Sequence, residues 1–232
     1  MSKKIAIIVA AGKGTRFGGK KQNIDINGHP MYWYSLKAFD DYGVDQIIIV
    51  VNKEDVNEIN TEGISKNVTV VPGGEERFDS VYNGLRAIKD CSESDIVMIH
   101  DGARPGISVK LIDRIVKDTE KYGACVASVP VVDTIRTVSD ESMCGRIIDR
   151  NVLRAMQTPQ SFKYPIIKDS FERFMNLTIK SRKAMQITDD VQVVEEMLGI
   201  KSHLSEGETT NIKVTKPEDI QKISNVTQRG EK

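Results

Sequence analysis

A loop near the N-terminus combines glycines with cations, the residue types that hold a polyphosphate. It lies in the segment IAIIVAAGKGTRFGGKKQ, directly after an apolar stretch typical of a buried strand. Gly12 and Gly14 lack a Cβ and can adopt positive φ, so successive backbone N–H groups can converge on one anion. Arg16 adds a planar guanidinium group that can bind two phosphate oxygens at once, and the ammonium groups of Lys20 and Lys21 add two compact positive charges. The loop therefore predicts an anion site.

This loop departs from two common phosphate-binding patterns. The dinucleotide pattern G-x-G-x-x-G requires a glycine where Phe17 stands. The P-loop pattern fits from Gly14 to Lys20 but then requires a hydroxyl that binds Mg²⁺, where Lys21 stands. The alternative is a flexible glycine turn with a solvated basic face. The apolar strand directly before the loop favours the phosphate site over that turn.

Two later strands also end in residues suited to ligand binding. One runs into Gly73 and Gly74 at the start of a helix, and the next delivers His100 and Asp101. Open α/β sheets bind ligands at the carboxyl ends of their strands. Mg²⁺ prefers one or two carboxylates plus phosphate oxygens, so Asp101 is the candidate metal ligand. The alternatives are an N-cap or an ion pair with Arg104, and we interpret His100 as a structural residue.

Apolar strands that alternate with helices must position these loops. We expect strands near residues 5–10, 46–51, 68–71, 95–99, 124–130, 202–204 and 211–214. We expect helices near residues 30–43, 55–60, 77–89, 108–123, 166–174, 188–198 and from a capping box at Thr215 and Glu218 onward. This alternation predicts a single α/β domain over residues 1–232, with a mostly parallel sheet covered on both faces.

Residues 132–150 break this pattern. They alternate loosely between apolar and polar residues around a long polar turn, which predicts two paired strands. A hairpin with so little apolar surface is marginally stable alone. We therefore expect it to lie against something other than its own domain.

Composition excludes several partner classes. Charged residues make up 28% of the 232 residues and balance to a net charge of zero, so no diffuse basic surface attracts nucleic acid or an anionic membrane. No apolar run approaches the roughly 20 residues that span a bilayer, and the N-terminus predicts a strand instead of a secretory signal. Cys91, Cys125 and Cys144 are widely spaced and predict reduced thiols. The expected location is the cytoplasm.

The sequence AAGKGTRFG followed by KKQ resembles the signature loop of a known family. It is similar to the cytidylyltransferases that act on small polyol phosphates, above all the 2-C-methyl-D-erythritol 4-phosphate cytidylyltransferase family. Further blocks match in the same order along nearly the whole chain: GGEERFDSV (73–81), HDGARP (100–105), VDTI (132–135), DRN (149–151), QTPQSF (157–162), TDD (188–190) and NIKVTKPEDI (211–220).

The resemblance implies a fold and an activity. The implied fold is a three-layer αβα, Rossmann-like nucleotidyltransferase domain with a projecting β-arm at residues 132–150. The implied reaction transfers CMP from CTP to 2-C-methyl-D-erythritol 4-phosphate with Mg²⁺ or another divalent cation. The arm is implied to clasp the same arm of a second subunit, which gives a homodimer in which Arg150 reaches the neighbouring active site.

The resemblance also implies a role for individual residues. The implied catalytic cations are Arg16, Lys21 and Lys213. The implied nucleotide-binding residues are Ala10, Ala11, Gly12, Gly14, Gly74, Glu75 and Ser80, of which the last three hold the cytosine. The implied substrate-binding residues are Asp101, Arg104, Thr134, Arg150 and Thr158, and Asp101 is also the implied metal ligand.

The chain departs from the family pattern at several positions. Lys20-Lys21-Gln22 stands where the family usually has Pro-Lys-Gln, and Asn23-Ile24 replaces an apolar pair. Gly102 replaces a common alanine, and Thr210 stands where many relatives carry an acidic residue. Three alternatives therefore stay open: a ribitol 5-phosphate cytidylyltransferase, a nucleotide-binding domain without turnover, and a dehydrogenase. The last is disfavoured by Phe17 and by Asn52, which replaces the expected acidic residue.

Overall fold

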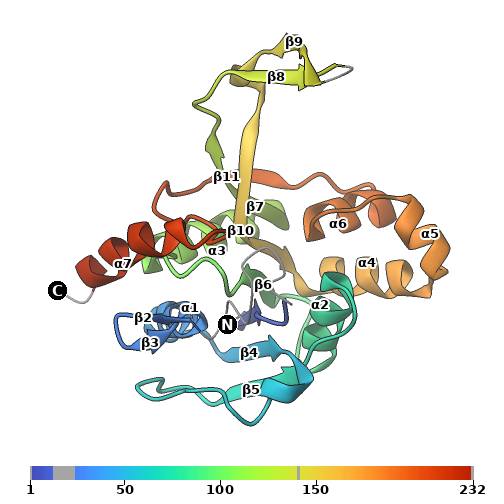
Figure 1. The fold of residues 1–232 in the computed structure, drawn as a ribbon. Coiled ribbons are helices and arrows are strands. Elements are labelled where there is room, and N and C mark those ends of the chain that lie inside the picture. Colours follow the sequence, from blue (N-terminus) through green and yellow to red (C-terminus); the bar gives the residue numbers. More distant parts are fainter. Residues whose placement is uncertain (1, 13–23, 140–141, 231–232) are drawn as a thin grey trace.

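A seven-stranded sheet forms the centre of the molecule in the computed structural model, which describes residues 2–12, 24–139 and 142–230 (Figure 1). Its strand order is β11-β7-β10-β6-β1-β4-β5. The strands are β1 (Lys4–Val9), β4 (Gln46–Val51), β5 (Val68–Pro72), β6 (Ile96–Asp101), β7 (Ala124–Pro130), β10 (Arg154–Lys163) and β11 (His203–Glu206). Only β10 is antiparallel to its sheet neighbours, because it pairs in that sense with both β6 and β7. The expected mostly parallel α/β sheet is confirmed.

Helices cover both faces of this sheet (Figure 1). In β1, Ile5 and Ile7 pack with α2, α4 and α6, whereas Ala6 and Ile8 pack with α1, α3 and α7. Side chains of a strand alternate between its faces, so a continuous apolar run supplies two cores at once. The helices are α1 (Met31–Tyr42), α2 (Arg77–Arg86), α3 (Val109–Tyr122), α4 (Tyr164–Asn176), α5 (Ile179–Ala184), α6 (Asp190–Leu198) and α7 (Glu218–Gly230).

The sheet register brings together the strand ends that are predicted to bind ligands. Val9, the last residue of β1, lies opposite Val50 on β4 and opposite Asp101 on β6. Beyond the paired strands, Gly102 donates its N–H to Val9 O at 2.9 Å and Gly73 donates to Val51 O at 2.7 Å. The loops that follow β1, β5 and β6 therefore leave the sheet on the same side, at the carboxyl ends of the strands, as the parallel arrangement predicts.

A separate two-stranded sheet stands away from the main body (Figure 1). It pairs β8 (Ile135–Val138) with β9 (Cys144–Ile148) in antiparallel register, and a short 3-10 helix, η4 (Arg150–Val152), leads from it into β10. The two paired strands expected within residues 132–150 are present as β8 and β9. The first part of β10 pairs with the end of β7, Arg154 opposite Pro130, and this pairing forms the stalk of the hairpin.

Most helix ends agree with the sequence signals. Gly43 and Gly199 end α1 and α6 in the left-handed region, with φ of 83° and 69°, where glycine carries no Cβ penalty. Ser108 caps α3 by accepting the Leu111 N–H. The small paired strands β2 (Asp25–Ile26) and β3 (His29–Pro30) precede α1.

Three local predictions are wrong. Residues 55–60 form no helix, and only the 3-10 helix η2 (Lys53–Asp55) lies nearby. Residues 211–214 form no strand. The backbone N–H of Val214 donates to the carbonyl oxygen of Ala103 at 2.8 Å, and Ala103 lies in a loop instead of a strand. Before α7, Asp219, and not Glu218, accepts the Thr215 N–H at 2.9 Å. In the last two cases a backbone N–H bonds to a partner that the local pattern does not specify.

Two composition-based expectations can be compared with the structure. Within residues 2–12, 24–139 and 142–230, no helix has both the length and the apolar character needed to cross a membrane. Cys91, Cys125 and Cys144 are all free. Burial raises the pKa of the Cys91 thiol to about 12 and that of Cys125 to about 11.

Candidate active site

The start of the glycine loop lies at the carboxyl ends of the strands, where the loops predicted to bind ligands meet. Ala10 donates its backbone N–H to Val50 O at 2.7 Å, so this amide is already bonded within the sheet. Gly12 has no heavy atom near the position that a Cβ would take. The predicted phosphate-binding residues Gly14, Arg16 and Lys21 lie outside the described residues.

The turn between β5 and α2 is closely packed. A Cβ on Gly73 would collide with the Cβ of Ala11, and one on Gly74 would collide with the Cβ of Asp79. Ser80, which is buried, accepts the Gly74 N–H with its Oγ at 3.1 Å. The three residues predicted to bind the base therefore differ in exposure. Gly74 and Glu75 are exposed, whereas Ser80 is buried and stabilises the turn.

Asp101 lies at the carboxyl end of β6 within a cluster of cations. Lys213 Nζ donates to Asp101 Oδ2 at 2.7 Å. Arg77 Nη2 lies 3.6 Å from Oδ1, and Arg104 Nε lies 3.9 Å from Oδ2. The predicted alternative of an Asp101–Arg104 pair is therefore the longest of three contacts, and the dominant partner is Lys213, which lies 112 residues away in sequence.

The charge state of Asp101 follows from these contacts. Burial disfavours the ionised carboxyl, but Arg77 and Lys213 outweigh it and hold the pKa of Asp101 well below its ordinary value. Arg104 Nε is a buried N–H donor with no hydrogen-bond partner among the described residues. The site therefore presents one ionised carboxylate and surplus positive charge, an arrangement suited to anionic ligands.

A divalent cation fits this site only in part. The described residues contain no group of three or more His, Cys, Asp or Glu side chains that could hold a metal. Asp101 offers an ionised carboxylate, and Mg²⁺ commonly takes one or two carboxylates plus waters and phosphate oxygens. The donor set therefore fits a metal that arrives with a polyphosphate, with Asp101 as its protein ligand.

His100 is a structural residue, as expected. It is fully buried, and burial lowers the pKa of its imidazole to about 4. Its Nε2 lies 3.2 Å from Arg104 O, which can only accept, so we assign the proton to Nε2. Nδ1 then accepts the Thr158 hydroxyl at 3.0 Å, and Thr158 Oγ1 accepts the Asp101 N–H at 3.1 Å. This chain of hydrogen bonds fixes the strand end that carries Asp101.

The hydrogen bonds of Thr158 lead to a prediction about stability. Replacing Thr158 with valine is expected to lower the free energy of unfolding by about 2 kcal/mol, because His100 Nδ1 and the Asp101 N–H would remain buried without partners. Thr134→Val, at an exposed threonine of the hairpin, is the control and is expected to change stability by less than about 0.5 kcal/mol. Urea unfolding of both variants measures the difference; equal midpoints would contradict the structural role of Thr158.

Arg104 connects three segments around the site by hydrogen bonds. It is buried and donates from Nη1 to Asn211 O at 2.9 Å and from Nη2 to Met156 O at 3.3 Å. Asn211 in turn donates its amide to Thr158 O at 2.7 Å. These bonds join the loop after β6, strand β10 and the irregular segment that carries Lys213. The segment thereby reaches Asp101 without being part of the sheet.

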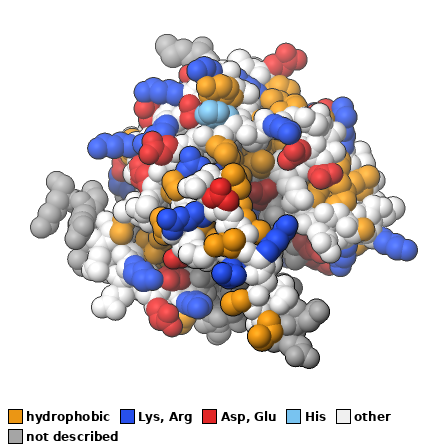
Figure 2. Space-filling view, turned by 90° about the horizontal axis from the view of Figure 1, so that it is seen from above, with side chains coloured by type: hydrophobic (Ala, Val, Ile, Leu, Met, Phe, Trp, Pro, Cys, Tyr) orange, Lys and Arg blue, Asp and Glu red, His pale blue; other side chains and the backbone are white. Residues whose placement is uncertain are grey.

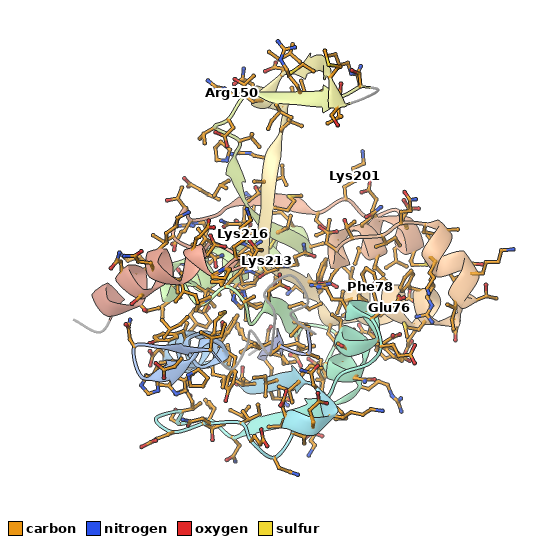
Figure 3. All side chains as sticks on the ribbon, viewed as in Figure 1. Glu76, Phe78, Arg150, Lys201, Lys213 and Lys216 are labelled. Carbon is orange, nitrogen blue, oxygen red and sulfur yellow. The ribbon has the colours of Figure 1, made fainter. Side chains whose placement is uncertain are left out.

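The remaining two predicted substrate-binding residues lie elsewhere. Thr134 and Arg150 are exposed residues at the base of the hairpin, where Arg150 Nη1 donates to Val132 O at 2.6 Å. Figure 3 shows Arg150 near the hairpin, apart from Lys213 in the main body. Within one chain, the structure therefore brings together Asp101, Arg104, Thr158 and Lys213 but not Thr134 or Arg150.

Arg77 and Asp190 are two residues of the site that were not predicted from sequence. Arg77 donates from Nη1 and Nη2 to the two carboxylate oxygens of Asp190, each at 2.7 Å, in a bidentate pair. Burial disfavours the cation, but Asp190 and Asp101 outweigh it and raise the pKa of Arg77. The only sequence signal is that both residues fall within matched blocks, GGEERFDSV and TDD.

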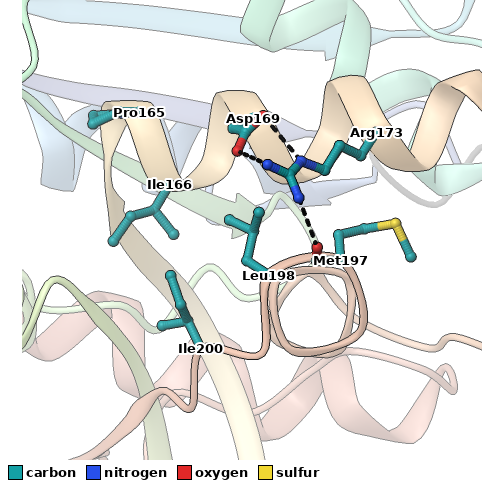
Figure 4. A pocket seen from close by; sticks show the side chains of 7 residues that line it. All are labelled: Pro165, Ile166, Asp169, Arg173, Met197, Leu198 and Ile200. Carbon is teal, nitrogen blue, oxygen red and sulfur yellow. Dashed lines mark hydrogen bonds and ion pairs between the residues drawn. The ribbon is translucent and has the colours of Figure 1, made fainter.

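A shallow pocket of about 430 Å³ lies on another part of the surface, between α4 and the end of α6 (Figure 4). An ion pair of Asp169 with Arg173, at 3.0 Å, lies on one side of it. None of the predicted site residues lines it. The lining residues are Pro165, Ile166, Asp169, Arg173, Met197, Leu198 and Ile200.

Comparisons with known proteins agree on one family. The family model of 2-C-methyl-D-erythritol 4-phosphate cytidylyltransferase matches residues 4–228. The chain is 42% identical over 227 residues to the protein of that name from Clostridium perfringens, with 95% of this chain and 96% of the relative covered. It is 37% identical over 227 residues to the protein of that name from Lachnoclostridium phytofermentans, with 95% and 94% covered.

Solved structures agree with the sequence relatives. The 4-diphosphocytidyl-2C-methyl-D-erythritol synthase of Anaerococcus prevotii superposes with a TM-score of 0.82 at 28% identity, over 98% of this chain and 99% of that one. The cytidylyltransferase of Thermus thermophilus gives a TM-score of 0.77 at 28% identity, over 99% and 100%. The family model spans nearly the whole chain, and the fold agrees with the solved structures of that name. This chain belongs to the 2-C-methyl-D-erythritol 4-phosphate cytidylyltransferase family.

Proposed function

We propose that this nucleotidyltransferase transfers a cytidylyl group from CTP to 2-C-methyl-D-erythritol 4-phosphate and releases pyrophosphate, a reaction of non-mevalonate isoprenoid biosynthesis. Family membership and the names of the relatives support this proposal. Within the site, the supporting observation is the group of Lys213, Arg77 and Arg104 around Asp101, beside the strand that enters the glycine loop. Cations so placed suit a reaction that gathers negative charge on phosphate oxygens.

The proposed chemical step needs positioning and charge. A phosphate oxygen of the acceptor forms a bond to the α-phosphorus of CTP, while the bond from that phosphorus to the bridging oxygen breaks and its electron pair leaves with pyrophosphate. A phosphomonoester has a second pKa of about 6, so it is largely a dianion at neutral pH and needs no base. The environment of His100 agrees with this, because both of its ring nitrogens bond within the protein.

We assign the predicted residues to parts of this step. Ala11, Gly12 and Gly14 of the glycine loop bind the triphosphate, and Ala10, whose N–H bonds to Val50 O, holds the start of the loop on the sheet. The β5–α2 turn binds the cytosine through Gly74 and Glu75, and Ser80 holds the turn in shape. Lys213, with Arg16 and Lys21 from the loop, stabilises the charge of the crowded phosphorus.

The acceptor pocket is assigned to residues of two subunits. In this proposal Asp101, Arg104 and Thr158 of one chain line it, and Thr134 and Arg150 come from the hairpin of the other. Mg²⁺ or another divalent cation, held by Asp101, would neutralise charge on the phosphates. Arg104 orients the loop after β6 through its bonds to Asn211 O and Met156 O.

A pyrophosphate-release assay tests the proposed function. The protein is incubated with Mg²⁺, each of the four nucleoside triphosphates and a panel of polyol phosphates. Release with CTP and 2-C-methyl-D-erythritol 4-phosphate is the expected result. Release only with ribitol 5-phosphate would change the acceptor, and no release with any pair would overturn the catalytic assignment.

We also propose that the hairpin pairs with the hairpin of a second copy. Large apolar side chains are exposed on and beside it, and they are Val132, Val138, Met143, Ile147 and Val152. Viewed from above, hydrophobic side chains reach the surface among charged ones (Figure 2). A two-stranded sheet this exposed is marginal alone, and contiguous apolar surface is typical of a protein interface. Pairing would also bring Arg150 close to a second active site.

A charge in the hairpin is expected to weaken the dimer. Ile147→Asp should raise the dimer dissociation constant at least about tenfold, because an unpaired carboxylate would be buried in the interface. Ile179→Asp on α5 is the matched control, since Ile179 is 63% exposed and Ile147 is 62% exposed. Sedimentation equilibrium measures both. Unchanged association of Ile147→Asp, or equal weakening by Ile179→Asp, would contradict the interface.

We further propose that the chain is one domain and that it works in the cytoplasm. Both core clusters pack on the same seven-stranded sheet. Residues 4–9, which are apolar from Ile5 onward, form β1, which lies between β4 and β6. This segment therefore belongs to the folded core, in agreement with the strand expected there.

A further inference from the structure

Two basic residues of α5 contact the two acidic residues that cap α2. Arg182 Nη1 donates to Asp79 Oδ1 at 3.2 Å, and Lys183 Nζ lies 3.7 Å from Glu76 Oε1. Glu76, labelled in Figure 3, and Asp79 form a capping box, in which each side chain accepts the backbone N–H of the other residue. Arg182 and Asp79 are 103 residues apart in the sequence, so a distant segment fixes the start of α2.

The two contacts differ in burial. The side chains of Arg182 and Asp79 are 16% and 25% exposed, whereas those of Lys183 and Glu76 are 65% and 49% exposed. Solvent and salt screen an exposed ion pair, which therefore contributes little. A partly buried pair is screened less, and a hydrogen bond between charged groups is stronger than one between neutral groups. The contact of Arg182 is therefore the one that can hold Asp79 in place.

Packing also fixes the guanidinium group of Arg182. Its central carbon lies 5.8 Å from the centroid of the Phe174 ring, and Nη1 lies 3.2 Å from Met175 Sδ. Phe174 is buried and meets the ring of Phe78 edge to face, with the centroids 5.3 Å apart. Phe78 directly precedes Asp79, so α4, α5 and the first turn of α2 pack together. The guanidinium group cannot leave Asp79 without losing these contacts.

The turn assigned to cytosine packs directly against Asp79. A Cβ on Gly74 would lie 2.2 Å from the Cβ of Asp79, which leaves no space between the two residues. Asp79 also fixes the end of the turn, because its Oδ2 accepts the Glu76 N–H at 3.0 Å. Gly74 and Glu75 therefore depend on Asp79 for their position. A displacement of Asp79 would move the backbone that is assigned to the base.

We infer that Arg182 is a positioning residue for nucleobase selection, because it holds Asp79 and thereby the turn against which the base lies. Cytosine carries an amino donor where uracil carries a carbonyl acceptor. A site distinguishes the two only if its own donors and acceptors are held within about 0.5 Å of the required geometry. The inference rests on the proposed function, since it takes this turn as the cytosine site.

Calorimetry on the full chain can measure this selection. The probes are the α,β-methylene analogues of CTP and UTP with Mg²⁺, whose α–β link is not cleaved. The unmodified protein should bind the CTP analogue at least about tenfold more tightly, the scale of one or two mismatched hydrogen bonds. Arg182→Met keeps an unbranched side chain beside the Phe174 ring but removes the charge and the donors. Its ratio of the two dissociation constants should fall below about threefold.

Three further variants test the contact itself. Arg182→Lys keeps a positive charge beside Asp79, and its ratio should be at least about twofold higher than that of Arg182→Met. Asp79→Asn should lower the ratio as Arg182→Met does, and it tests the same contact if Arg182→Met does not fold. Lys183→Met removes the exposed cation next to Arg182 and is the matched control, so its ratio should equal that of the unmodified protein. Thermal unfolding confirms that each variant is folded.

The results separate this inference from the proposed function. Pyrophosphate release by the unmodified protein is measured first, and its absence with every substrate would overturn the function itself. Release together with an unchanged ratio in Arg182→Met would overturn only the inference, since a merely structural arginine lowers both affinities by the same factor. A ratio near one in the unmodified protein, or an equal fall in Lys183→Met, would also overturn it.

Discussion

Lys213→Ala is expected to lower kcat for cytidylyl transfer by about 10²–10³-fold, the scale of losing one transition-state electrostatic contact. Lys213 Nζ lies 2.7 Å from Asp101, and its side chain is 45% exposed at the edge where the phosphate loops meet. It is therefore held near the reacting groups yet accessible to them. Since the charge on phosphate oxygens grows in the transition state, kcat should fall more than KM rises.

Lys216 provides the matched control for this prediction. It is an exposed lysine three residues further along the same segment, and Figure 3 labels both side chains. Its backbone N–H bonds to Asp219 Oδ2 at 3.0 Å, so the local conformation does not depend on its side chain. Lys216→Ala should change kcat less than about twofold. Steady-state pyrophosphate release measures both variants, and similar rates would remove Lys213 from the catalytic residues.

Arg16→Ala and Lys21→Ala are each expected to lower turnover at least about 10²-fold. Both residues lie in the glycine loop, outside the described residues, so this prediction rests on the loop sequence and on the family assignment. A triphosphate that transfers its α-phosphoryl group carries several negative charges. An arginine guanidinium can bind two phosphate oxygens at once, and a lysine ammonium adds a compact positive charge, so together they neutralise these charges.

An exposed lysine far from the loop is the reference for these two variants. Lys201 follows α6, is exposed and is labelled in Figure 3. Lys201→Ala should turn over at the unmodified rate, which controls for the loss of one surface charge. Turnover at the unmodified rate in both Arg16→Ala and Lys21→Ala would rule out the role of the loop in catalysis.

The family and the strand that enters the glycine loop could be predicted from sequence because their signals are local. The run Ile5–Val9 is apolar at every position, which requires burial on both faces and so predicts a strand within a covered sheet. The glycines after α1 and α6 mark helix ends by their backbone freedom alone. Since the carboxyl ends of parallel strands lie on the same side of a sheet, the approximate position of Asp101 could also be predicted from sequence.

For the hairpin, the sequence predicted that two strands pair, but not what surface covers them. Alternation and a polar turn predict two strands, and β8 and β9 confirm them. The same residues cannot indicate what covers Val138 or Ile147, because that depends on a surface outside the local pattern. The irregular course of residues 211–214 was missed for a related reason: β-branched residues favour a strand, but the nearest backbone partner of Val214 is Ala103 in a loop.

The sequence by itself determined the α/β class, the family and the types of charged residue at the site. Only the tertiary structure decided which charges meet: Asp101 pairs with Lys213 across 112 residues, and Arg77 pairs with Asp190 across 113. Periodicity and capping signals extend over a few residues, whereas these contacts depend on how the loops pack at the sheet edge. The physical reason is that ion pairs form between whichever side chains the packed backbone brings within a few ångströms, and no local pattern records that distance.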